Sequence, residues 1–290
     1  MDTSFTNSRE EVARAQLDTT DWAGLSRSEQ IAALELEGYV LIPNVLSPET
    51  VNAVGAELNR LETTPVDYSD HQRGHPDVLL SDSPHSIGLI AHAPIVDFLS
   101  QLFGDELICT SCGYSLSEPG HPGIAIHTDS QPYGSQIFGM QASSPCLVRV
   151  LYYLDDLTRE CSPFKVIPRS HLSLHADANP YRRYLSHPQE RMVTCRAGSA
   201  VIINQKVFHG NYPNHSDGRR RLLAIAYRPA WAGPIDDVPD HDKEMISRLP
   251  QEVRPFFGSM NTRHIEYDLP NRPDDMQREA AGINPSRWNG

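Results

Sequence analysis

SAVIINQKVFHGNYPNHSDGRRRLLAIAYR, residues 199–228, decides the fold, because two apolar runs flank a loop rich in Asn, Pro, Asp and Gly. Short apolar runs bounded by such turn residues are typical of strands. Similar runs lie upstream with no helical pattern between them, whereas parallel strands need a long crossover, usually a helix. The sequence therefore predicts an antiparallel sandwich or barrel. Its predicted strands are ELICTSCGYSL (106–116), GIAIHT (123–128), CLVRVLYYL (146–154), FKVIP (164–168), RMVTC (191–195), SAVIIN (199–204) and RRLLAIAYR (220–228).

Helical signals come before this region. Ser26 and Glu29 form a capping box ahead of IAALELEG, and Ser47 followed by Pro48 marks a second helix start. GYVLIPNVL between these two helices reads as a strand. Apolar residues at helical spacing, ended by a glycine, predict a third helix over residues 94–103.

The predicted fold is mainly β with flanking helices, a double-stranded β-helix (jelly roll) of the cupin-like kind. No internal linker divides the chain, so we expect one domain over residues 1–290. Residues 1–105 would be its largely helical N-terminal part, residues 106–230 its jelly-roll core and residues 231–290 a C-terminal extension.

The composition narrows the possible partners. A net charge of −12 makes nucleic acid an unexpected partner, because phosphate binding needs a basic face. We expect no apolar run to reach the length of a membrane span, and we do not expect the polar start to act as a signal peptide. The five cysteines fit a reducing compartment, with Cys109 and Cys112 as strand-lining thiols. We therefore expect a cytoplasmic protein without a membrane partner, its oligomeric state left open.

One of the four His-x-Asp sequences differs from the others. His127-Thr128-Asp129 ends the apolar strand GIAI, so alternation aims the two ligand side chains to one side of the chain. Two histidines and a carboxylate leave half of an octahedral metal's positions open, which is the ligand set of non-heme Fe(II) oxygenases. The other three lie in turns or polar stretches, at His75-Asp77, His175-Asp177 and His215-Asp217.

A third ligand is expected from another strand. His209 follows the apolar run SAVIINQKVF and leads into a loop, which suits a position beside His127 and Asp129. His121 competes for this role, but its turn EPGHPG is a less rigid support. The predicted catalytic metal ligands are therefore His127, Asp129 and His209.

An arginine cluster opens the last predicted strand, RRRLLAIAYRP. Alternation places Arg220 on the opposite face from Arg219 and Arg221, which are read as solvated edge residues. An inward guanidinium is unfavourable unless it meets a carboxylate, and a dicarboxylic co-substrate supplies one in bidentate geometry. Arg220 is thus the candidate co-substrate residue.

Four segments resemble the phytanoyl-CoA dioxygenase family of Fe(II)/2-oxoglutarate-dependent oxygenases. The eleven residues from His209 to Arg220 match the family's spacing between its last metal ligand and its 2-oxoglutarate-binding arginine. The segments are LELEGYVLIPNVLSPETV (34–51), HTDSQPYG (127–134), LYYLDDLTRECSPFKVIPRSH (151–171) and AGSAVIINQKVFHGNYPNHSDGRRRLLAIAY (197–227).

The resemblance implies Fe(II), 2-oxoglutarate and O2 as cofactor and co-substrates, with Arg220 holding the distal carboxylate of 2-oxoglutarate. Oxidative decarboxylation would release CO2 and succinate, and hydroxylation of an unactivated C–H bond is the default outcome. Desaturation, epoxidation and ring closure use the same oxidant. Halogenating relatives replace the metal-binding aspartate with a small residue, so the presence of Asp129 argues against a halogenase.

Three departures from the family pattern place the chain away from the best-known members. Ile126 stands where Trp commonly precedes the metal histidine, Cys161-Ser162-Pro163 replaces the usual Asn-Gly, and Arg169 replaces the glycine of PGSH. None of them removes a metal ligand. Substrates of well-known members are therefore a poor guide to the substrate here.

Alternation also predicts pocket residues on LVRVLYYL, where Arg149, Leu151 and Tyr153 share one face and Tyr152 lies on the other. If the first face points inward, Arg149 would meet an anionic substrate. Tyr153 would then hydrogen-bond 2-oxoglutarate, with Leu151 beside it. Ordinary cross-strand packing of these side chains is the alternative.

The expected substrate is a small biosynthetic intermediate, bordered by Gln131 and Tyr133 from the loop after the metal pair. No basic stretch suggests a coenzyme A site, and an acidic chain does little to attract that polyanion. Two other functions stay open. One is a cupin-type isomerase or hydrolase that uses the metal without 2-oxoglutarate and would not need Arg220, and the other is a non-catalytic jelly-roll binding protein.

Overall fold

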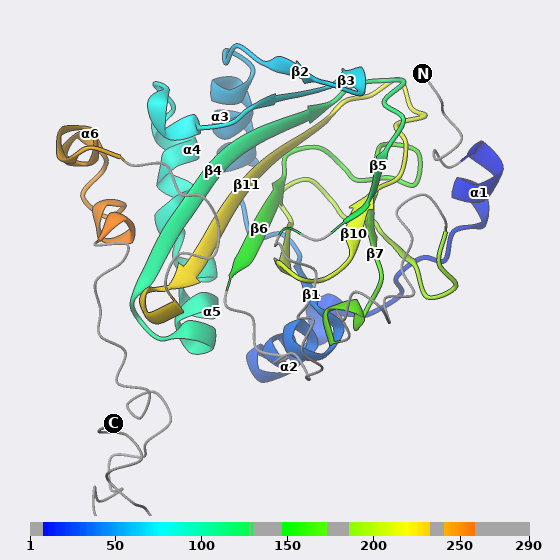
Figure 1. The fold of residues 1–290 in the computed structure, drawn as a ribbon, viewed down its shortest axis with the longest axis horizontal. Helices are drawn as coiled ribbons and strands as arrows, with labels where there is room; N and C mark the ends of the chain where they lie inside the picture. Colours follow the sequence, from blue (N-terminus) through cyan, green and yellow to red (C-terminus); the bar gives the residue numbers. More distant parts are fainter. Residues whose placement is uncertain (1–7, 128, 130–146, 173–185, 233–240, 259–290) are drawn as a thin grey trace, which may run out of the picture.

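The computed structural model describes residues 8–127, 129, 147–172, 186–232 and 241–258. Its strands form two antiparallel sheets (Figure 1). One sheet has seven strands in the order β1-β9-β6-β11-β4-β3-β2, and the other has four in the order β5-β10-β7-β8. This arrangement confirms the predicted mainly β jelly roll with flanking helices.

The strands are β1 Tyr39–Ile42, β2 Thr64–Val66, β3 Ser69–His75, β4 Leu107–Ser117, β5 Ile124–His127, β6 Val148–Tyr153, β7 Phe164–Val166, β8 Arg191–Val193, β9 Ala200–Asn204, β10 His209–Asn211 and β11 Arg220–Pro229. The α-helices are α1 Arg9–Arg14, α2 Arg27–Glu37, α3 Pro48–Leu58, α4 Pro84–Gly88, α5 Ala93–Phe103 and α6 Lys243–Arg248. Short 3-10 segments are η1 Trp22–Gly24, η2 Val78–Leu80, η3 Leu89–Ala91, η4 Ser170–Leu172, η6 Ala230–Ala232 and η7 Arg254–Phe257.

The helices begin and end where the sequence signals them. Ser26 and Glu29 form the reciprocal capping box of α2, and Gly38 ends that helix in the left-handed conformation with φ 86°. The Ser47 side chain accepts from the Thr50 amide at the start of α3. These local hydrogen bonds need no tertiary contact, so the sequence alone could predict them.

Besides the predicted β1, two further strands lie in the N-terminal part that the sequence indicated to be largely helical. β2 and β3 form the edge of the large sheet, and β3 pairs with β4 so that Gln72 lies opposite Ser117. His75, which stands in a polar stretch without the apolar pattern of a strand, is the last residue of β3. β3 lies between β4 and the edge strand β2, and most of its residues are polar. They carry no apolar alternation, which is why the sequence did not reveal β3.

Residues 84–103 have the length and apolar composition of a membrane span, contrary to the expectation that no run approaches it. In the structure they form α4, η3 and α5 instead of one continuous helix. Side chains such as Ile95 and Phe98 are fully buried in the main hydrophobic core. Burial inside the fold therefore accounts for their apolar character.

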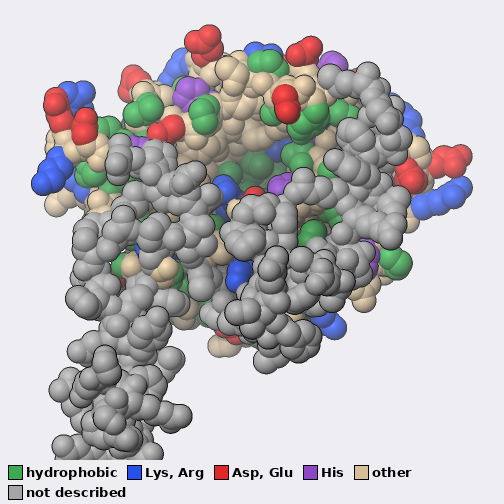
Figure 2. Space-filling model, in the orientation of Figure 1, with side chains coloured by type: hydrophobic (Ala, Val, Ile, Leu, Met, Phe, Trp, Pro, Cys, Tyr) green, Lys and Arg blue, Asp and Glu red, His purple; other side chains and the backbone are tan. Residues whose placement is uncertain are grey.

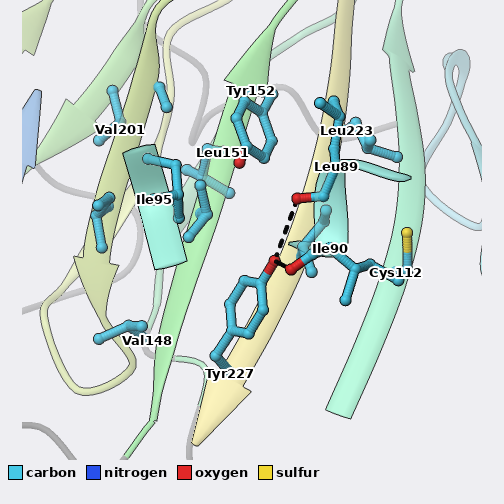
Figure 3. Packing of buried hydrophobic residues seen from close by; sticks show 14 of the residues in the cluster. Leu89, Ile90, Ile95, Cys112, Val148, Leu151, Tyr152, Val201, Leu223 and Tyr227 are labelled. Carbon is cyan, nitrogen blue, oxygen red and sulfur yellow. Dashed lines mark hydrogen bonds between the residues drawn. The ribbon is translucent and has the colours of Figure 1, made fainter. Parts of the chain in front are cut away.

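The two faces of the large sheet have different neighbours. Figure 3 shows Tyr227 of β11 beside Leu89 and Ile90, and its hydroxyl donates to the Ile90 carbonyl at 3.0 Å. Tyr152 of β6 lies against α5, where its hydroxyl is 3.3 Å from Nδ1 of His92. As predicted, the neighbouring residues of β6 then face the other way, toward the small sheet.

Two of the departures from the family pattern lie at left-handed backbone positions, Ser162 with φ 49° and Arg169 with φ 66°. Glycine adopts this conformation without strain, and other residues do so at a cost. Both residues form compensating contacts. The Arg169 guanidinium pairs with Glu37 at 2.7 Å, and the Ser162 hydroxyl donates to the Tyr212 carbonyl at 3.2 Å.

A buried carboxylate joins α3 to α4. Glu57 accepts from the backbone amides of His85 and Ser86 at 2.9 and 2.8 Å. It also accepts from the His85 ring and the Ser86 hydroxyl, both at 2.7 Å. Burial raises the pKa of Glu57, but these four hydrogen bonds outweigh it and the pKa is lower than usual. The ionised form of Glu57 therefore stabilises the fold.

We expect Glu57→Gln to lower the free energy of unfolding by about 1–3 kcal/mol at pH 7, because one oxygen acceptor becomes a donor facing donors. Since the folded pKa is depressed, the contribution of Glu57 is present above the unfolded-state pKa of about 4.3 and is lost as pH falls through the folded value. Urea denaturation at pH 7 and at a series of pH values that extends well below 4 measures this. Glu62→Gln, an exposed control, should change little. A Glu57→Gln deficit that does not shrink with acid would contradict the assignment.

Candidate metal and co-substrate site

Two histidines face each other across the small sheet. His127 is the last residue of β5, His209 is the first of β10, and the two are direct partners in the antiparallel register. Their ring centroids are 4.4 Å apart. β10 also pairs with β7, and His209 lies opposite Val166 of that strand. His209 therefore has a strand on either side. The loop that the sequence predicts after His209 begins only after Asn211, where β10 ends.

Asp129 completes the group. Its backbone amide donates to the Gln205 carbonyl at 2.8 Å, which ties the residue to the turn before β10. Its carboxylate oxygens lie 3.8 Å from Nε2 of His127 and 3.7 Å from Nε2 of His209. One ligand atom from each residue lies within 4.8 Å of the other two, so these three residues can hold a metal ion.

Backbone carbonyls set the tautomer of both imidazoles. Nδ1 of His127 lies 2.9 Å from the Ala125 carbonyl, and Nδ1 of His209 lies 3.0 Å from the Val207 carbonyl. A carbonyl only accepts, so each Nδ1 carries the proton and each Nε2 keeps its lone pair. Burial lowers the pKa of His209 to about 4, with a smaller opposing effect of Asp129. His209 is therefore neutral near pH 7, as a metal ligand must be.

Arg149 contacts the carboxylate of the group. Its Nε lies 2.8 Å from Oδ2 of Asp129, and the Arg149 side chain is largely buried on β6. Burial raises the pKa of Asp129, but His209, Arg149 and His127 together hold it below its usual value. Arg149 does face inward, as the alternation predicts, and the structure places its guanidinium against Asp129. A substrate contact for Arg149 remains a prediction.

Arg220 is fully buried, and none of its three guanidinium nitrogens has a hydrogen-bond partner among the described residues. On the inward face of the large sheet it lies opposite Ser117 of β4. Burial lowers the pKa of Arg220, yet an arginine stays protonated. A buried cation without a partner is unfavourable, so this pocket is suited to an anion.

The neighbouring Arg221 differs from its prediction. It was expected at a solvated edge, but its guanidinium pairs with Asp155 at 2.7 and 3.0 Å. Oδ2 of Asp155 also accepts from the Arg221 backbone amide at 2.7 Å. Asp155 comes from the end of β6, a partner that lies far away in the sequence. Because Asp155 is paired with Arg221, its carboxylate does not form a hydrogen bond with Arg220.

The other predicted pocket residues lie in different surroundings. Tyr153 is fully buried, and its hydroxyl has no hydrogen bond of normal geometry among the described residues, although Asn211 lies beside it. Leu151 is part of the hydrophobic core. Gln131 and Tyr133 lie outside the described residues. His121 is buried and is not one of the three residues of the metal group.

The middle of the face seen in Figure 2 is hollowed, and acidic, basic and histidine side chains are visible there. The residues of the site fit both iron and 2-oxoglutarate. Two neutral imidazoles and a carboxylate are the donor set that non-heme iron takes, and they leave positions for other ligands. The guanidinium of Arg220, which has no partner in the part of the chain that the structure describes, supplies what a dicarboxylate needs at its far end. Fold and site together define a jelly-roll metalloenzyme of the 2-oxoglutarate type.

The comparison with known families agrees. The phytanoyl-CoA dioxygenase (PhyH) family matches residues 34–222, well over half of the chain. The chain belongs to this family and is a 2-oxoglutarate-dependent non-heme iron dioxygenase, which confirms the resemblance seen in the sequence. Fe(II), 2-oxoglutarate and O2 are its cofactor and co-substrates. Family membership disfavours both the cupin-type isomerase and the non-catalytic binding protein.

Similar proteins are distant. Dioxygenase trt7 of Aspergillus terreus is 22% identical, over 89% of this chain and 93% of its own. A probable alpha-ketoglutarate-dependent hypophosphite dioxygenase of Stutzerimonas stutzeri is 21% identical, over 73% and 82%. Among solved structures, HygX of Streptomyces hygroscopicus with nickel and 2-oxoglutarate has a TM-score of 0.60 at 20% identity, covering 76% of this chain and 98% of its own. These structural likenesses show a shared fold.

Replacing His127 or His209 with Gln should weaken Fe(II) binding about 100-fold or more, since even outer-shell changes cost 10- to 100-fold. Anaerobic calorimetric titration with Fe(II) measures this. His215→Gln makes the same change in a rival His-x-Asp sequence and serves as the matched control. Stoichiometric iron retained at unchanged affinity in His209→Gln would exclude His209 as a ligand.

Proposed function

We propose that this enzyme uses His127, Asp129 and His209 to hold Fe(II) and Arg220 to bind 2-oxoglutarate. On this proposal it oxidises an unactivated C–H bond of a small biosynthetic intermediate, by default to an alcohol, and releases succinate and CO2. The observation that carries the proposal is the fully buried Arg220, whose guanidinium has no partner among the described residues. A metal group alone would fit many reactions, whereas this added cation requires an anionic co-substrate.

Each residue of the proposed site has a separate task. His127 and His209 present neutral Nε2 lone pairs because backbone carbonyls hold the Nδ1 protons. Asp129 supplies the negative charge, and the ion pair with Arg149 restrains its carboxylate. When bound, iron with 2-oxoglutarate and O2 supplies an oxidant that can remove hydrogen from unactivated carbon. The residues then decide which C–H bond is presented to it.

The residues that share a face of the large sheet with Arg220 are mostly small. Gly113 and Ser115 of β4 lie opposite Ala224 and Leu222 of β11. Tyr153 of β6 is the register partner of Leu222, which projects to the same face of β11 as Arg220. This placement supports the proposed contact of Tyr153 with 2-oxoglutarate.

A small-molecule substrate is supported by the similar structures. HygX was solved with hygromycin B, and SnoN is described as an epimerase from nogalamycin biosynthesis. SnoK is described as a carbocyclase from nogalamycin biosynthesis. Epimerisation and ring closure both require a C–H bond to be broken, so they share this step with the proposed hydroxylation. The acidic chain is in keeping with a substrate that is not a polyanion.

Purified protein with Fe(II), ascorbate, O2 and 2-oxoglutarate should form succinate slowly even without its substrate. Chromatographic quantification of succinate over time measures this uncoupled turnover, and omission of iron or O2 should abolish it. Absence of 2-oxoglutarate binding under anaerobic conditions would contradict the proposed co-substrate site.

Arg220→Met should raise the dissociation constant for 2-oxoglutarate about 100-fold or more, because the carboxylate loses a buried charge partner. Anaerobic titration of the Fe(II) protein measures the constant. Arg219→Met removes an exposed guanidinium from the adjacent residue and should leave the dissociation constant for 2-oxoglutarate unchanged. Equal affinities in the two variants would show that Arg220 does not bind 2-oxoglutarate.

A further inference from the structure

His121 is a buried group that the proposed reaction does not yet use. Its side chain is fully buried, and Nε2 has no hydrogen-bond partner among the described residues. Nδ1 lies 3.0 Å from the hydroxyl of Ser117. A buried imidazole with one satisfied and one unsatisfied nitrogen is unusual, because buried polar atoms are generally hydrogen-bonded.

The fold places this imidazole in the Arg220 pocket. Ser117, which contacts His121, is the direct partner of Arg220 in the pairing of β4 with β11. Cross-strand partners project to the same face of a sheet. Desolvation and then the charge of Arg220 lower the pKa of His121 to about 3. His121 is thus close enough to feel the buried guanidinium and is neutral near pH 7.

The turn that carries His121 does not need the imidazole. The backbone amide of His121 donates to the Glu118 carbonyl at 3.1 Å, and the backbone carbonyl of His121 accepts from the Asn214 amide at 2.9 Å. The Asn214 side chain donates to the Ser117 carbonyl at 3.3 Å. These bonds hold the turn against the loop before β11 whatever side chain stands at position 121. The ring itself is therefore available for a ligand.

We propose that His121 is a second binding residue for the distal carboxylate of 2-oxoglutarate, donating from Nε2 beside the Arg220 guanidinium. The proposal rests on the proposed function, which brings that carboxylate into this pocket. Unsatisfied donors or hydroxyls of Arg220, Tyr153 and His121 would then converge on one anion. A carboxylate has enough lone pairs to accept from all three.

Ser117 selects the tautomer that this role requires. When its hydroxyl donates to Nδ1, the imidazole proton resides on Nε2 and can be donated to the carboxylate. A neutral histidine suits this pocket better than a second cation, because two like charges buried together would repel each other. His121 thus adds a hydrogen bond with fixed direction, while Arg220 supplies the charge.

His121→Leu should raise the dissociation constant for 2-oxoglutarate about 10- to 100-fold, the range expected for a hydrogen bond to a charged group. His121→Gln, which keeps a donor near the position of Nε2, should recover part of the affinity. The decisive comparison uses 2-oxovalerate, which has the same metal-chelating end but no distal carboxylate. Its affinity should be the same in wild type and both variants. Anaerobic titration of the Fe(II) proteins measures all six constants.

Nitrogen-15 NMR of labelled histidine gives a readout independent of turnover. Addition of 2-oxoglutarate should shift the His121 signals to the pattern of an Nε2–H imidazole with a hydrogen-bonded proton. Equal losses for 2-oxoglutarate and 2-oxovalerate in His121→Leu would assign His121 a purely structural role, and unchanged affinities would reject the proposal. Failure of the wild-type protein to bind 2-oxoglutarate would overturn the proposed function itself, and this inference with it.

Discussion

A guanidinium that folding buries without a counter-ion among the described residues is the constraint on which the site depends. Arg220 lies on β11, which is paired with β6 on one side and β4 on the other. Strand pairing on both sides fixes its direction, and Arg221 occupies the carboxylate of Asp155. On the proposed function, this unfavourable burial is relieved when the distal carboxylate of 2-oxoglutarate binds. Binding of that anion and stability of the fold are linked through this residue.

The two sheets contribute different halves of the chemistry. The small sheet brings His127 and His209 together as register partners, with Asp129 tied to the turn before β10. The large sheet supplies the cations, Arg149 beside Asp129 and Arg220 in its own pocket. A molecule with a metal-chelating end and a distal carboxylate matches this division. Specificity for such a co-substrate therefore follows from where the sheets place opposite charges.

Much of the candidate site was predictable from the sequence. The exceptions are residues whose placement no local sequence pattern reports. His127 and Arg220 stand on apolar strands, where alternation gives the direction of a side chain. β3 is a mostly polar strand and His121 sits in a turn, so neither carries a periodic signal. Arg221 departed from its prediction because its partner Asp155 is distant in the sequence. Contacts between distant segments depend on strand order, which no local pattern reports.

The sequence by itself determined the strand-rich class of the fold, the capped helices and the chemical types of the site residues, because these follow from patterns within a few residues or from a matching spacing. Tertiary structure alone decided that His209 pairs with His127, that Arg149 restrains Asp129 and that His121 lies buried near Arg220. The reason is physical. Register between strands far apart in the chain, together with burial, sets which polar atoms meet a partner and which are left for a ligand.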